Sequence, residues 1–135
     1  MLGLVPLAPK RLDDYRPIVG DAVIDEIREL ARPLRGARVL HVNATAYGGG
    51  VAEILATLVP LMQDIGLNAE WQVMRGTDEF FQVTKAMHNG LQGMAVELGA
   101  AQRATYEAST DRMVEQWEGE YDFVVIHDPK PAGIR

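Results

Sequence analysis

The sequence predicts an α/β fold, a Rossmann-like parallel sheet with flanking helices. Residues 37–43 form a short apolar run with β-branched side chains, bounded by glycines, which is typical of a buried central strand. A Gly-rich turn, an apolar helical stripe over residues 51–65 and a second strand at 69–74 follow. This order of elements defines a βαβ unit with parallel strands. Residues 122–127 are another apolar run and predict a third strand.

The first twenty residues are predicted to be irregular, with room for a short extended piece at 2–7. Proline and glycine punctuate this segment: Pro6, Pro9, Pro17 and Gly20. One domain then covers residues 21–135. The whole chain of 135 residues has the usual length of a single domain and is too short for two domains with a cleft between them.

Three more stretches complete the predicted order of helices. A helix begins at Asp21 and runs to about residue 34, a second covers 77–91 with Thr77 or Asp78 as its cap, and a third covers 98–117. Helical spacing assigns an inward face to the first helix: Val23, Ile27, Leu30 and Leu34. It assigns a similar face to the second: Phe80, Phe81, Thr84, Met87 and Leu91.

Composition excludes several classes of function. The chain has no cysteine, so disulfides, thiolate metal sites and cysteine nucleophiles are absent from it. Its net charge of −6 argues against a nucleic-acid binder, although a local site can still hold phosphate. No apolar stretch reaches the length of a membrane span and no signal peptide is evident. We therefore expect a cytoplasmic protein with no membrane or nucleic-acid partner.

Polar, turn-rich sequence follows two of the predicted strands. In a doubly wound sheet, ligands bind at the carboxyl ends of strands, where the strand order reverses. If the strand at 37–43 lies between the other two, its end brings Asn43 and the glycine turn beside the end of the third strand, which carries His127 and Asp128. The sequence therefore predicts a ligand site at this edge of the sheet.

Three consecutive glycines, Gly48, Gly49 and Gly50, open the helix over 51–65. Without Cβ atoms the backbone can approach a ligand closely, and the helix N-terminus offers free N–H groups to a phosphate or diphosphate. A tight turn with no ligand is an equal alternative. Neither a dinucleotide nor a P-loop fingerprint fits the turn. Glu53 suits the helix dipole but would repel a close phosphate, so it is expected to bind hydroxyls or to reciprocate the cap.

For two of the three histidines the sequence leaves two roles open. His127 is either a ligand-facing residue or a packed one, and His41 lies in mid-strand, where it is expected to be core. His88 and Asn89 either hold sugar hydroxyls or sit at a helix C-terminus near its carbonyls. Lys85 lies one turn before Asn89 but is a surface residue by default. The spacing of the histidines gives no metal site.

Three blocks of sequence together resemble one enzyme group. Residues 38–58 (RVLHVNATAYGGGVAEILATL), residues 79–85 (EFFQVTK) with 88–93 (HNGLQG), and residues 125–131 (VIHDPKP) occur in the same order there. The group is the trehalose synthase (glycosyltransferring) and retaining trehalose phosphorylase group. The resemblance runs from about residue 12 onward and matches only the N-terminal part of these enzymes.

The resemblance implies a GT-B fold, two Rossmann-like domains with the active site between them. It implies that the turn Gly48–Gly50 approaches the donor phosphates and that His127 lies close to the transferred glucose as the catalytic residue. Further sugar or acceptor contacts are expected from a set of polar residues: Asn43, Glu53, Lys85, His88, Asn89 and Asp128. No cofactor or metal is implied; the ligands are sugars and a nucleoside-diphosphate glucose.

The expected activity of the full-length enzyme is retaining transfer of glucose from a nucleoside-diphosphate glucose to glucose, which gives trehalose. Two alternatives stay open: a retaining trehalose phosphorylase, and a non-catalytic binding or partner module. The 135-residue chain alone is expected to be inactive, because it lacks the donor domain and the Arg and Lys side chains with which that domain holds the leaving diphosphate. We also expect self-association through an uncovered sheet edge or apolar face.

Overall fold

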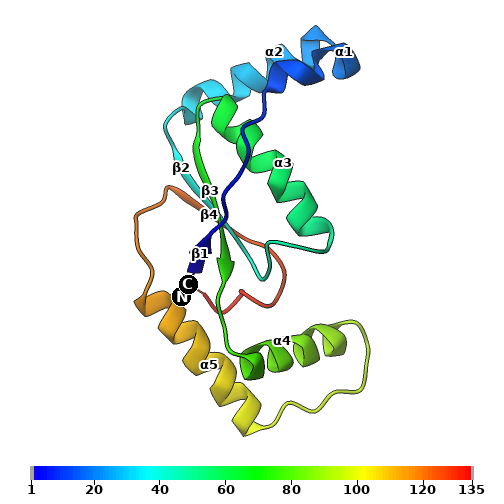
Figure 1. The fold of residues 1–135 in the computed structure, drawn as a ribbon, viewed down its shortest axis with the longest axis vertical. Helices are drawn as coiled ribbons and strands as arrows, with labels where there is room; N and C mark the ends of the chain where they lie inside the picture. Colours follow the sequence, from blue (N-terminus) through cyan, green and yellow to red (C-terminus); the bar gives the residue numbers. More distant parts are fainter. Residues whose placement is uncertain (1, 135) are drawn as a thin grey trace.

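One four-stranded sheet organises the molecule, which the computed structural model describes from residue 2 to residue 134 (Figure 1). Its strands are β1 (Leu2–Leu4), β2 (Arg38–Asn43), β3 (Asn68–Met74) and β4 (Phe123–Ile126), in the order β1-β3-β2-β4. β2 is parallel to β3 and to β4, which confirms the predicted α/β class and the central place of this strand. β1 was expected only as an extended piece, and it adds an antiparallel edge to the parallel sheet.

The four longer helices match the predicted stretches to within a few residues. They are α2 (Asp21–Ala31), α3 (Gly50–Asp64), α4 (Asp78–Leu91) and α5 (Ala100–Glu115). Beyond α2 the chain tightens into a short 3-10 turn, η2 (Arg32–Leu34). The Thr77 hydroxyl accepts a hydrogen bond from the Phe80 backbone N–H at 3.3 Å and so caps α4, as the sequence indicated.

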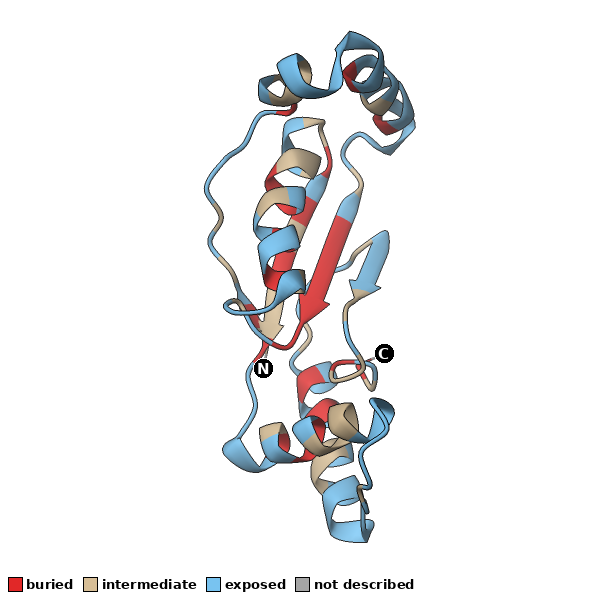
Figure 2. Ribbon diagram, turned by 90° about the vertical axis from the view of Figure 1, so that its right-hand side faces the viewer, coloured by how far each residue is buried: buried red, intermediate tan, exposed pale blue. Residues whose placement is uncertain are grey.

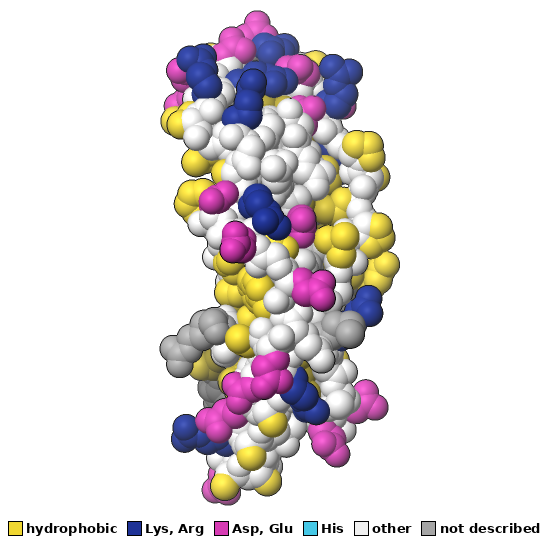
Figure 3. All heavy atoms as spheres, turned by 90° about the vertical axis from the view of Figure 1, so that its left-hand side faces the viewer, with side chains coloured by type: hydrophobic (Ala, Val, Ile, Leu, Met, Phe, Trp, Pro, Cys, Tyr) yellow, Lys and Arg dark blue, Asp and Glu magenta, His cyan; other side chains and the backbone are white. Residues whose placement is uncertain are grey.

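The prediction of an irregular N-terminal segment is wrong for residues 12–19. They form a 3-10 turn, η1 (Leu12–Tyr15), and a short helix, α1 (Arg16–Val19). Asp13 accepts hydrogen bonds from Arg16 at 3.0 Å and from Arg28 of α2 at 2.9 Å, and these two guanidinium groups lower its pKa. Figure 3 shows the resulting gathering of both charge signs at the end of the molecule that α1 and α2 form. Long-range partners of this kind order a segment whose local sequence suggests a loop.

The inward faces predicted for two helices are partly wrong. Ile24 and Ala31 are the buried residues of α2, whereas Val23 and Leu30 are 41% and 67% exposed. The α2 helix lies at one end of the molecule, where little of it meets the sheet (Figure 1). Leu91 at the end of α4 is likewise exposed, although Phe80 near its start is fully buried.

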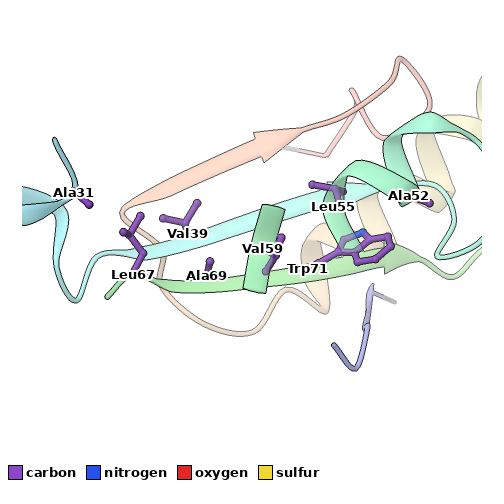
Figure 4. Packing of buried hydrophobic residues seen from close by; sticks show 8 residues of the cluster. All are labelled: Ala31, Val39, Ala52, Leu55, Val59, Leu67, Ala69 and Trp71. Atoms are coloured by element: carbon purple, nitrogen blue, oxygen red, sulfur yellow. The ribbon is translucent and has the colours of Figure 1, made fainter. Parts of the chain in front are cut away.

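Two hydrophobic clusters sandwich the sheet. On one face α3 packs over β2 and β3, and Figure 4 shows Trp71, Leu55 and Val59 interlocking there. On the other face Leu40 and Val42 join side chains of α4 and α5. Alternate residues of β2 therefore face opposite clusters, and nearly all of this strand is buried (Figure 2). Among residues 2–134, none of the helices has the length and apolarity that crossing a bilayer requires.

Candidate functional site

The carboxyl ends of β2 and β4 lie side by side. The two strands are parallel neighbours, and the backbone N–H of His127, just past β4, donates to the Val42 carbonyl of β2 at 2.8 Å. From β2 the chain crosses to β3 on one side and later returns to β4 on the other. The strand order therefore reverses at β2, which is where α/β sheets bind ligands.

The glycine turn leads from the carboxyl end of β2 into α3. Gly48 and Gly49 have φ values of 72° and 90°, in the left-handed region of the backbone that residues with a Cβ adopt only with strain. Gly50 is the first residue of α3. All three are exposed, and a Cβ added to any of them would meet no heavy atom within 4 Å. No side chain among residues 2–134 caps α3, so the first N–H groups of this helix have no side-chain partner. This geometry suits an anion.

Asn43 is the last residue of β2, as predicted, but its side chain is turned into the chain. Its side chain is 1% exposed, its amide nitrogen donates to the Thr45 carbonyl at 2.8 Å, and its amide oxygen accepts from the Trp71 indole at 2.7 Å. Both ends of the amide are thus engaged inside the chain. In this structure Asn43 shapes the start of the glycine turn and does not present itself to a sugar.

His127 meets a second histidine at the edge of the sheet. Its Nε2 lies 3.0 Å from Nδ1 of His41, which is 4% exposed. Burial, with the neighbouring His127 ring, lowers the pKa of His41. His41 is therefore a core residue, as predicted, but it is also the direct neighbour of the predicted catalytic residue. Single-sequence reasoning missed this pair, and the available signal was that both histidines belong to adjacent strands.

Two acidic candidates flank the same edge. Asp128 directly follows His127, is exposed and has φ of 69°, the single positive φ at a non-glycine position within residues 2–134. Aspartate tolerates this region better than most residues. Glu53 lies in the exposed part of the first turn of α3, four residues after Gly49. Both residues are exposed to solvent.

The remaining candidates lie on another helix. Lys85 is exposed, and His88 and Asn89 are half-buried in the last turns of α4. The Asn89 and His88 carbonyls accept the N–H of Gln92, so the helix-end reading of these residues is correct in its geometry. Figure 1 shows α4 beyond the carboxyl end of the sheet. The helix that carries these three residues therefore lies beyond the end of the sheet where the glycine turn and His127 follow their strands.

The described residues contain no group of three or more potential metal ligands. Two cavities lie outside the predicted site. One of about 620 Å³ is lined by Leu2, Gln72 and Trp117, and one of about 340 Å³ lies between α4 and α5 beside Val83. Neither includes a predicted site residue.

Comparisons with known proteins agree with the three sequence blocks. A family model described as "Trehalose synthase, N-terminal domain" matches residues 41–135. The chain is 52% identical to a trehalose synthase of Rubrobacter xylanophilus, over 100% of this chain and 33% of that protein. It is 46% identical to a trehalose synthase of Thermococcus litoralis, over 93% and 31%. A trehalose phosphorylase of Pleurotus pulmonarius is 29% identical, over 91% and 18%.

The chain spans about a third of the length of the trehalose synthases that it matches. The match covers both the glycine turn and the end of β4, so it includes the two polar ends that meet at the sheet edge. This chain belongs to the family of trehalose synthase N-terminal domains.

Proposed function

We propose that the protein containing this chain is a retaining glucosyltransferase that makes trehalose from a nucleoside-diphosphate glucose and glucose. The observation that carries the proposal is the 52% and 46% identity to trehalose synthases, against 29% to a trehalose phosphorylase. We further propose that the chain forms one wall of a GT-B cleft in the cytoplasm and that a second domain forms the other wall.

The proposed chemistry exchanges one glycosidic bond for another at the same face of the sugar. The bond from glucose C1 to the diphosphate oxygen breaks, and a bond from C1 to an acceptor hydroxyl oxygen forms. The hydroxyl proton passes to the departing diphosphate. Negative charge therefore grows on the leaving oxygen, and groups that stabilise that charge accelerate the step.

The chain offers specific groups for this step. The start of α3, which no side chain of residues 2–134 caps, and the open space around Gly49 and Gly50 support binding of the donor diphosphate there. We assign His127 to the transferred glucose, and Glu53 and Asp128 to hydroxyl groups near it. Lys85, His88 and Asn89 are assigned to the acceptor, because α4 stands beyond the same end of the sheet (Figure 1).

The test is a set of assays on the purified full-length protein. Trehalose with a nucleoside diphosphate should release glucose and form the nucleoside-diphosphate glucose, whereas trehalose with inorganic phosphate should give no product. Turnover with phosphate alone would instead identify a phosphorylase. Absence of both reactions would overturn the enzymatic proposal and favour a binding module.

A second assay uses the 135-residue chain by itself. We expect no measurable transfer, because the chain spans about a third of the related synthases. Robust turnover by this chain would contradict the division of the site between two domains.

A further inference from the structure

The two histidine rings form a hydrogen bond in one plane. Nδ1 of His41 and Nε2 of His127 are 3.0 Å apart, the ring centroids are 5.3 Å apart and the ring planes differ by 16°. In two rings stacked face to face, the distance between the centroids would be close to the distance between the nearest nitrogens. Here the centroids are much farther apart than the two nitrogens. The rings instead meet edge to edge, which is the geometry of an N–H···N hydrogen bond. One of the two facing nitrogens must carry the proton and the other must accept it.

The surroundings of His41 decide which nitrogen carries that proton. His41 is 4% exposed and its burial lowers its pKa, so near neutral pH the ring is uncharged and holds one proton. Its other nitrogen, Nε2, is buried and has no hydrogen-bond partner within residues 2–134. A buried N–H without a partner is rarer in proteins than a buried acceptor without one. The proton therefore belongs on Nδ1, which donates to His127.

We propose that His41 is a positioning residue that holds His127 in a single tautomer. Because His127 Nε2 accepts from His41, the ring proton of His127 lies on Nδ1. At Nδ1 the half-buried His127 then offers a ligand an N–H donor and not a lone pair. The ligand chemistry that fits is an oxygen acceptor, either a sugar hydroxyl or a phosphate oxygen.

The inference rests on the proposed function only for the identity of that ligand. The tautomer itself is a property of the chain and can be measured without substrate. Long-range proton–nitrogen NMR of the 15N-labelled 135-residue chain distinguishes protonated from unprotonated ring nitrogens. The expected result is an unprotonated Nε2 and a protonated Nδ1 in His127, with the same pattern in His41. A protonated His127 Nε2 in this unaltered chain would overturn the proposal.

Two substitutions of His41 separate the hydrogen bond from packing. The amide nitrogen of His41→Asn can reach the place of Nδ1 and donate to His127, so the His127 tautomer should be preserved. His41→Leu fills similar space but has no donor, so His127 should become a mixture of tautomers. An unchanged His127 tautomer in His41→Leu would overturn the proposal. If this variant does not fold, the tautomers of the unaltered chain and of His41→Asn decide the question.

Matched controls test whether loosened packing alone, without loss of the hydrogen bond, changes the His127 tautomer. Val39 lies two residues before His41 on the same strand and is also buried, so Val39→Ala loosens the same face without touching the pair. It should leave the His127 tautomer unchanged. His88 on α4 serves as an internal reference whose nitrogen signals should not move in any variant.

The consequence for catalysis is measured in the full-length protein. His41→Leu should lower kcat by about tenfold with a small change in KM, and His41→Asn should restore most of it, by analogy with metal-binding histidines, where loss of the hydrogen-bond partner that orients the ring costs about ten- to a hundredfold. Equal kcat values in both variants would overturn the positioning role. If the tautomer result holds but the unaltered enzyme transfers no glucose, the proposed function fails and the assignment of the pair stands.

Discussion

The indole N–H of Trp71 donates to the side-chain oxygen of Asn43 at 2.7 Å, and both side chains are 1% exposed. This bond joins β3 to the last residue of β2. Because Asn43 also donates to the Thr45 carbonyl, the bond fixes the point from which the glycine turn departs. The interior of the sheet and the geometry of the predicted phosphate site are coupled through a single amide.

This coupling predicts a large stability loss for a small change. Trp71→Phe keeps an aromatic ring but leaves the Asn43 oxygen buried without a donor, which should cost about 1–3 kcal/mol of unfolding free energy. Urea unfolding measures it. In an Asn43→Ala background the same Trp71→Phe change should cost less, because the stranded acceptor is gone. Equal costs in the two backgrounds would show that the hydrogen bond contributes nothing.

Glycine substitutions should separate backbone strain from ligand binding. Gly49→Ala and Gly36→Ala place a Cβ at φ of 90° and 82° in open space, so each should lose about 1–2 kcal/mol of stability. Gly36 lies at the opposite, amino end of β2, so its variant should keep its affinity for a nucleoside diphosphate in the full-length protein. Gly49→Ala should lose that affinity, measured by calorimetry.

A third glycine gives the complementary control. Gly50→Ala adds a Cβ in open space at the first residue of α3 without a positive φ, so its stability should stay unchanged or rise slightly. Equal nucleotide affinities in the Gly49→Ala and Gly36→Ala variants would argue against a diphosphate site at the turn.

The buried histidine predicts a loss of stability in mild acid. The pKa of His41 is lowered in the folded chain, mainly by burial, from an ordinary value of 6.5. Above that value the ring is neutral in both states. As the pH falls below it, the unfolded chain takes up a proton that the folded chain resists, so the free energy of unfolding decreases, by at most about 1.4 kcal/mol per pH unit.

Comparison with a variant isolates this contribution from that of the carboxylates. The unfolding free energy should fall more steeply from about pH 7 to about pH 5 in the unaltered chain than in His41→Asn, which cannot take up the proton. Parallel curves would contradict a neutral His41 in the folded state.

The edge strand predicts self-association of the 135-residue chain. β4 pairs with β2 on one side and with no strand of residues 2–134 on the other, and Phe123, Val124 and Val125 are 51%, 44% and 39% exposed. An apolar edge of this kind can pair with the same edge of a second copy. Light scattering at rising concentration should show dimers or larger species.

A charge at the edge should abolish that association. Val124→Lys should give a monomer, whereas Leu30→Lys, which places the same charge at a 67% exposed leucine on α2, should still associate. A monodisperse monomer of the unaltered chain at high concentration would contradict the prediction.

The sequence by itself determined the order of the elements and the edge where the polar residues gather. Apolar runs, helical spacing and glycine turns are local signals, and they located β2, β3 and β4 and the four longer helices to within a few residues. The glycine turn after β2 and the His-Asp pair after β4 were visible for the same reason. Three blocks of sequence, read together, also indicated the family that the comparisons show.

Only the tertiary structure decided which partner each side chain has. His41 and His127 are 86 positions apart, and their contact depends on β4 lying beside β2 in the observed register. From the sequence Asn43 was expected to bind a sugar, but its side-chain oxygen accepts a hydrogen bond from Trp71 on the neighbouring strand. The helical turns at residues 12–19 likewise depend on Arg28 and Asp64, which are distant in sequence. Local periodicity carries no record of such contacts, because strand order and register are set by the packing of the whole chain.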